Sequence, residues 1–259
     1  MACRHGGAET DGSLGMNEDS MTGIDNVLAR LAMIDERHGP LPPLLLGLTL
    51  LTGMIDAISY LRLGHVFVAN MTGNVVFLGF AAAGVTDFSV PASLTAIAAF
   101  LAGAYVGGRA GRQQVSHRGR LFWLAILLEC LLIAAAWTLN AFNTQLDPAI
   151  SHYGLIILLG LMMGAQNAVV RRLAVPDLTT TVLTLTLTGL AADLPPPAGS
   201  RLRRIASVVT MFVGALIGDL LVLRAETGIA LAVAFALLVA ISLVAFTGRN
   251  SNKAWTSFR

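Results

Sequence analysis

Long apolar runs dominate the pattern of hydrophobic and polar positions along the chain. Six runs each hold about 20 mostly apolar residues, enough for a helix to cross a hydrocarbon core of about 30 Å. They cover 42–61, 91–108, 121–140, 153–170, 205–223 and 228–247. The pattern predicts an all-α integral membrane protein with six full transmembrane helices.

Two further apolar segments, 66–84 and 175–193, differ from these spans. Each begins with polar or β-branched residues and becomes more apolar in its second half. This pattern predicts broken or re-entrant segments, because irregular backbone is tolerated at membrane depth only inside protein or beside a cavity. A plain bundle of seven or eight helices is the alternative.

The basic residues discriminate between these topologies. Arg4 is far from any span, which leaves 16 of the 17 Lys and Arg residues. They divide evenly between the two sides if all eight segments cross. If segments 66–84 and 175–193 return to the side they entered, only Arg62 and Arg224 lie outside. The positive-inside bias therefore favours six crossings, with both termini in the cytoplasm.

The composition agrees with a membrane protein. Of 259 residues, 55% are hydrophobic and 12% charged, against about 25% charged in soluble domains. Two cysteines provide neither a disulfide framework nor metal-ligand spacing, and a net charge of +2 does not indicate nucleic-acid binding. No nucleotide-binding, hydrolase or zinc-protease motif occurs. We therefore predict no enzymatic activity, cofactor or metal.

The organisation expected from this pattern is a polar N-terminal tail, one membrane domain and a short C-terminal tail. The N-terminal tail covers 1–41, with apolar residues at helical spacing over 24–34. The membrane domain covers 42–247, and residues 248–259 form a cytoplasmic C-terminal tail. The stretch 24–34 is either a surface helix or part of a loosely ordered tail.

Short matches 111 residues apart indicate an internal repeat over 42–140 and 153–247. The matched pairs are Gly53 with Gly164, Asp56 with Asn167, Gly103 with Gly214, and Gly107 with Gly218. Each unit then contains a span, an unusual segment and two more spans. Since three crossings is an odd number, the second unit is expected to be inverted, as in many transporters.

Polar residues near the two unusual segments are the predicted substrate- or ion-binding site. They are Asp56, Asn70, Thr72 and Asn74 in the first unit, and Asn167, Asp177, Thr179, Thr180 and Thr181 in the second. A half-helix beginning there would direct free N–H groups into the protein and favour an anionic group. The alternatives are ordinary N-capping for the segment residues and hydrogen bonding between helices for Asp56.

Glu129 is the predicted proton-relay residue. It lies near the middle of the span 121–140, with no basic residue at the same depth. A carboxylate there costs about 2.5–3.5 kcal/mol on insertion scales. An unpaired carboxyl at this depth is expected to be protonated at neutral pH. A neutral, hydrogen-bonded structural acid is the other interpretation.

Two runs of sequence resemble a known family. The run from Gly53 to Asn74 is similar to the signature of the bacterial YoaK family, and the run from Gly164 to Thr181 is similar to its second motif. The resemblance covers about 42–247. It implies a multi-pass protein of the bacterial inner membrane, from a group of unknown function loosely described as small permeases. It implies no substrate.

Two functions follow from these patterns. The first is a small-solute transporter or permease, whose partners are the lipid bilayer and a small solute or proton. The second is a membrane scaffold or accessory subunit in which the same residues hold helices together. Self-association stays open, and a lipid-modifying enzyme has only the intramembrane carboxylates in its favour.

Overall fold

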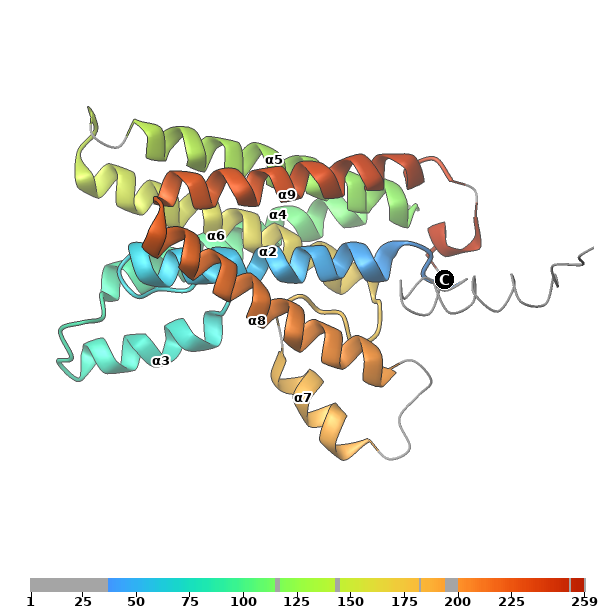
Figure 1. Ribbon diagram of the computed structural model, residues 1–259, viewed down its shortest axis with the longest axis horizontal. Helices are drawn as coiled ribbons and strands as arrows, with labels where there is room; N and C mark the ends of the chain where they lie inside the picture. Colours follow the sequence, from blue (N-terminus) through green and yellow to red (C-terminus); the bar gives the residue numbers. More distant parts are fainter. Residues whose placement is uncertain are drawn as a thin grey trace, which may run out of the picture.

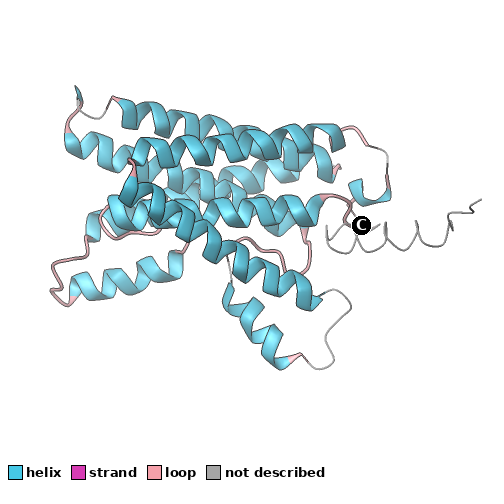
Figure 2. Cartoon of the chain, viewed as in Figure 1, coloured by secondary structure: helices cyan, strands magenta, loops and turns pink. Residues whose placement is uncertain are grey.

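The computed structural model describes residues 37–114, 117–142, 145–181, 183–193, 200–251 and 253–258. Across these ranges the regular structure is helical, apart from isolated β-bridge residues, among them the pair His117 and Ser257 (Figure 2). The predicted all-α class is confirmed. The stretch 24–34 lies outside the described residues.

Six helices in the described ranges are long and apolar enough to cross a membrane, as predicted. They are α2 (Leu41–Arg62), α4 (Val90–Gln114), α5 (Arg118–Ala141), α6 (Pro148–Leu173), α8 (Ser200–Arg224) and α9 (Thr227–Gly248). All extend beyond the predicted apolar runs, because polar residues complete their first or last turns. His152, one residue before the predicted run 153–170, therefore lies near the start of α6, where Asp147 is the N-cap and Pro148 follows it.

Two short helices correspond to the two unusual segments. They are α3 (Met71–Ala82) and α7 (Leu183–Ala192). Twelve helical residues extend about 18 Å, which is too short to cross the hydrocarbon core. Helix α3 lies towards one end of the bundle and α7 towards the other (Figure 1). Irregular backbone precedes each of them.

The arrangement of the helices places α2 and α6 at the centre, where they are the most enclosed. Helix α2 packs along α8 and α9, and α6 packs along α4 and α5. Helices α5 and α9 also pack against each other, while α3 contacts α4 and α7 contacts α8 (Figure 1). Exchanging the helices of the first unit for those of the second reproduces this pattern of neighbours.

Glycines allow the closest of these contacts. A Cβ added at Gly107 of α4 would lie 2.8 Å from the carbonyl oxygen of Ala165 in α6. A Cβ at Gly218 of α8 would lie 2.7 Å from the carbonyl oxygen of Met54 in α2. Residues 107 and 218 are 111 positions apart, as are 54 and 165. The two contacts therefore join equivalent positions of the repeats.

The same spacing relates the other close glycine contacts. Gly103 meets the Leu161 backbone where Gly214 meets that of Leu50, and Gly164 meets Phe100 and Ala104 where Gly53 meets Met211 and Ala215. Each partner is again 111 residues from its counterpart. The α4–α6 contact thus repeats the α2–α8 contact position by position.

Candidate functional site

Asp56 anchors the irregular stretch that leads into α3. Its Oδ1 accepts hydrogen bonds from the backbone N–H groups of Val68 (3.1 Å) and Ala69 (2.8 Å), and the Asn70 N–H also bonds to this carboxyl group. The Asp56 side chain is buried. A single acceptor on α2 thus satisfies several N–H groups that have no helical partner.

Asn74 of α3 also binds the irregular stretch, through both backbone polar groups of Phe67. Its Oδ1 accepts from the Phe67 N–H (2.9 Å), and its Nδ2 donates to the Phe67 carbonyl (2.5 Å). Asn70 caps α3 by accepting from the Gly73 N–H at 3.3 Å. Thr72 is exposed. Asn70 is thus an N-cap, and Asn74 acts as an internal clamp.

In the second unit the irregular stretch is held by hydrogen bonds between side chains, whereas in the first unit the Asp56 side chain bonds to backbone N–H groups. The Thr181 hydroxyl donates to Oδ1 of Asn167 at 2.7 Å. Gln166, beside Asn167 on α6, donates from Nε2 to the hydroxyls of Thr52 on α2 (2.9 Å) and Thr180 (3.3 Å). These bonds connect the second irregular stretch to both central helices.

Asp177 fixes the second irregular stretch to α8. Its Oδ1 lies 2.7 Å from Arg204 Nε, and its carbonyl accepts from the Ser207 hydroxyl at 3.3 Å. Arg204 also pairs with Asp193, beyond the end of α7, at 2.7 Å. Asp177 and Thr180 both have positive φ, at 64° and 60°. A non-glycine residue in this region signals a constrained backbone.

Glu129 lies on α5 and is buried, with 1% of its surface exposed. Neither carboxyl oxygen has a hydrogen-bond partner. Along α5 it lies between Trp123 and Trp137, which pack against Phe246 and Phe235 of α9. Buried carboxyl oxygens without partners are costly, so Glu129 calls for an explanation beyond packing.

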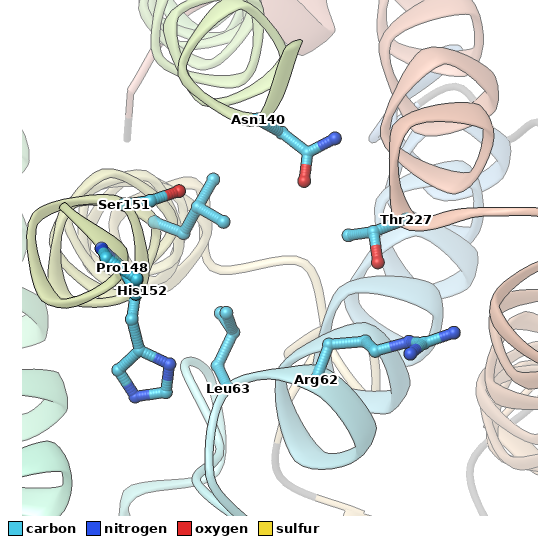
Figure 3. Close-up of a pocket in the computed structure, with 8 residues that line it drawn as sticks. Arg62, Leu63, Asn140, Pro148, Ser151, His152 and Thr227 are labelled. Atoms are coloured by element: carbon cyan, nitrogen blue, oxygen red, sulfur yellow. The ribbon is translucent and has the colours of Figure 1, made fainter. Parts of the chain in front are cut away.

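A polar cavity of about 350 Å³ opens at the end of the bundle where α2 and α5 finish and α6 and α9 begin. Asn140, Ser151 and Thr227 face this space from three different helices, with Leu63 below them (Figure 3). Arg62 also lines the cavity, and its Nη2 donates to the Val222 carbonyl at 2.8 Å. The volume is in the range of small-molecule pockets.

The predicted site residues thus form separate groups. Asp56, Asn70 and Asn74 hold the first irregular stretch, while Asn167, Thr180 and Thr181 hold the second. Asp177 turns instead to α8, and Thr179 and Thr72 are exposed. None of the predicted residues lines the cavity of Figure 3.

Several residues of these groups were not predicted. Thr52 and Gln166 are uncharged residues in spans and carried no charge signal, although Gln166 lies beside Asn167 in the second motif. Arg204 lies just before the predicted span 205–223, and it was counted only as a basic residue that indicates the cytoplasmic side. The cavity residues come from four helix ends, so no local pattern groups them. Among the described residues, no three His, Cys, Asp or Glu side chains gather as a metal site.

Comparison with known proteins identifies the family. Residues 44–244 match the family described as protein of unknown function (DUF1275). The chain belongs to this family. Over 148 residues it is 35% identical to the UPF0700 transmembrane protein YoaK of Bacillus subtilis (strain 168), a match covering 57% of this chain and 64% of that relative. No solved structure matches the chain.

These matches confirm the predicted resemblance to the YoaK family and the membrane assignment. The family match includes both irregular stretches, α3, α7 and most of the six long helices. Family membership identifies a multi-pass membrane protein and assigns no activity.

Proposed function

We propose that this protein is a small-solute permease of the bacterial cytoplasmic membrane, with both termini in the cytoplasm. The observation that carries the proposal is the repeated glycine contact, in which α4–α6 matches α2–α8 position by position. Helices α2 and α6 take corresponding places in the pattern of neighbours and run in opposite directions (Figure 1). This supports inverted repeats, the plan on which many secondary transporters alternate between two open states.

The polar groups within the bundle support a route for a solute or a proton. The cavity enters one end between α2, α5, α6 and α9. Deeper in the molecule lie Gln166, whose Oε1 has no hydrogen-bond partner, and Glu129. Unsatisfied polar atoms at such depth are expensive, and in membrane proteins ionisable ones mark transport pathways. Glu129 is the proposed proton carrier, and no catalytic role is proposed.

Reconstituted vesicles test this function with two measurements. The first is proton flux, followed with a trapped pH-sensitive dye under an imposed membrane potential. The second is osmotic swelling in a series of small polar solutes. We expect native protein to exceed protein-free vesicles in at least one measurement, and Glu129→Gln to reduce the proton flux at least tenfold. Glu226→Gln, at an exposed helix end, is the matched control. Native rates equal to those of empty vesicles would refute the proposal.

A scaffold role is the second candidate, and one observation favours it. Four of the predicted site residues form hydrogen bonds or ion pairs with other residues of the protein: Asp56, Asn74, Asn167 and Asp177. In a scaffold, Asp56→Asn would change thermal stability alone and the chain would co-purify with a membrane partner. In a permease, the vesicle measurements would also change.

A further inference from the structure

The same four helices, α2, α5, α6 and α9, form both ends of the bundle, and a helix that begins at one end finishes at the other. The cavity lies where α2 and α5 finish and α6 and α9 begin. At the other end, α6 and α9 finish while α2 and α5 begin (Figure 1). If the repeats are equivalent, a chamber like the cavity is expected at both ends. At the second end, the C-terminal segment of the protein occupies that place.

The C-terminal segment, residues 253–258 with the short helix η2 (Ala254–Thr256), folds back onto this end. Trp255 is its anchor, with 7% of its surface exposed. A Cβ added at Gly39 would lie 2.6 Å from the indole, and one at Gly119 or Gly248 would lie 3.2 Å from it. Three glycines from separate parts of the chain thus form a socket for one aromatic ring.

Polar contacts secure the segment around this ring. Arg118 donates to the Trp255 carbonyl at 3.2 Å and to the Leu173 carbonyl, at the end of α6, at 2.6 Å. His117 forms the β-bridge with Ser257. The Arg172 guanidinium lies 5.1 Å from the centre of the Phe258 ring. The segment therefore bonds to the ends of the helices that would surround a chamber.

Equivalent positions make the comparison specific. Arg62 lines the open cavity, and its counterpart 111 residues later is Leu173, whose carbonyl accepts from Arg118. Pro148 also lines the cavity; when the same spacing is extended five residues before each unit, Pro148 corresponds to Arg37, whose carbonyl accepts from Arg118 at 3.4 Å. Positions that border empty space at one end border the Arg118–Trp255 contact at the other.

We propose that residues 253–258 form a removable plug, which closes one of two equivalent chambers and holds the protein open at the opposite end. This inference rests on the proposed permease function for its purpose, but the plug itself is testable without transport. Release requires residues 253–258 to withdraw one indole and a few polar contacts, while the helices of the bundle keep their contacts with one another. Arg118 would retain the carbonyls of Leu173 and Arg37 after release.

Cysteine accessibility in the full chain tests the plug. Cys3 and Cys130 are replaced by Ser and Ala, and a single cysteine is introduced by Leu173→Cys, at the buried end of α6 beside Arg118, or by Ser151→Cys in the open cavity. A small membrane-impermeant thiol reagent is applied to detergent-solubilised protein. We expect Trp255→Ala, or truncation after Gly248, to raise the labelling rate of Leu173→Cys at least tenfold. The Ser151→Cys rate should stay equal or fall.

The two reporters separate opening from unfolding. A rise at Leu173→Cys with a steady or lower rate at Ser151→Cys supports the plug. An unchanged Leu173→Cys rate after truncation overturns it, because the end is then closed without the segment. A parallel rise at both sites also counts against it, since the segment then stabilises the whole bundle; Trp255→Phe repeats the comparison with a milder change. A selective rise without flux in vesicles would leave the plug standing and reject the permease.

Discussion

At the scale of single residues, the buried carboxyl groups of this protein fall into two kinds. The carboxyl group of Asp56 accepts hydrogen bonds from backbone N–H groups of the stretch before α3. Glu129 has no partner for either oxygen. A satisfied group contributes to stability, whereas an unsatisfied one costs free energy. The two residues are therefore expected to respond oppositely to removal.

For Asp56, removal of the side-chain acceptor should destabilise the protein. Asp56→Ala leaves buried N–H groups unpaired, at about 1–3 kcal/mol for each donor. Asp56→Asn keeps an acceptor oxygen, as Asn167 does at the equivalent position, and should cost much less. Thermal unfolding in detergent compares the two variants. Equal losses would show that the negative charge, and not the acceptor, holds the stretch.

For Glu129, removal of the polar group should stabilise the protein while harming its function. Glu129→Leu removes two buried oxygens without partners and keeps a similar volume, so we expect a gain of about 1–3 kcal/mol. Glu129→Gln retains buried polar atoms and should show no such gain. The melting temperatures in detergent provide the measurement. A destabilised Glu129→Leu variant would indicate that the carboxyl group has a structural partner.

At the scale of helices and segments, glycine contacts hold the long helices together and polar side chains hold the two unusual segments. Glycines bring α2 and α8, and α4 and α6, into backbone contact. The segment containing α7 is held at both ends by one side chain, because Arg204 pairs with Asp177 before the helix and Asp193 after it. The stretch before α3 is held instead by the hydrogen bonds of Asp56 and Asn74.

The glycine contacts predict a sharp difference between neighbouring positions. Gly107→Ala would push a methyl group against the Ala165 backbone, and we expect a loss of about 1–3 kcal/mol from overpacking. Gly108→Ala meets nothing within 4 Å and is the matched control. It should be neutral or slightly stabilising, because alanine is the better helix former. Thermal unfolding of both variants decides, and a neutral Gly107→Ala would contradict the contact.

The double ion pair predicts a local effect. Arg204→Ala should loosen 177–193 and increase amide hydrogen exchange there, while exchange in α3 stays unchanged. Arg201→Ala, an exposed position on the same helix, is the control. Asp193 is about half exposed, so its own contribution is small. Uniformly faster exchange across the bundle would show that Arg204 supports more than this segment.

At the scale of the whole molecule, six helices in the described ranges are long enough to cross a membrane, whereas α3 and α7 are shorter. We expect cysteines at Arg62, Asp87 and Glu226 to be labelled from one compartment and a cysteine at Asp193 from the other. Impermeant thiol reagents applied to cells and to inverted vesicles provide the measurement. Labelling of positions 62 and 87 from different compartments would mean that α3 crosses the membrane, and the repeats would then not be inverted.

The sequence alone predicted the helical class, the number of long helices and the family. The six spans, the two unusual segments and the family motifs all depend on the residue types within about 20 consecutive positions. In a bilayer that local pattern is decisive, because apolar length and backbone hydrogen bonding determine what can cross. The glycines matched at the spacing of 111 are the ones whose contacts the fold repeats, although inverted repeats stay a prediction that these contacts support.

Tertiary structure alone decided which partner each polar group takes. The sequence placed Asp177 with Thr179–Thr181 in one candidate site, but the fold turns its carboxylate to Arg204, 27 residues away. It also seats Trp255 beside Arg118, across 137 residues, and assembles the cavity from four helix ends. Hydropathy predicts that a residue lies within the membrane, but it does not predict which residues contact it. Those contacts depend on packing between helices that are distant in the chain.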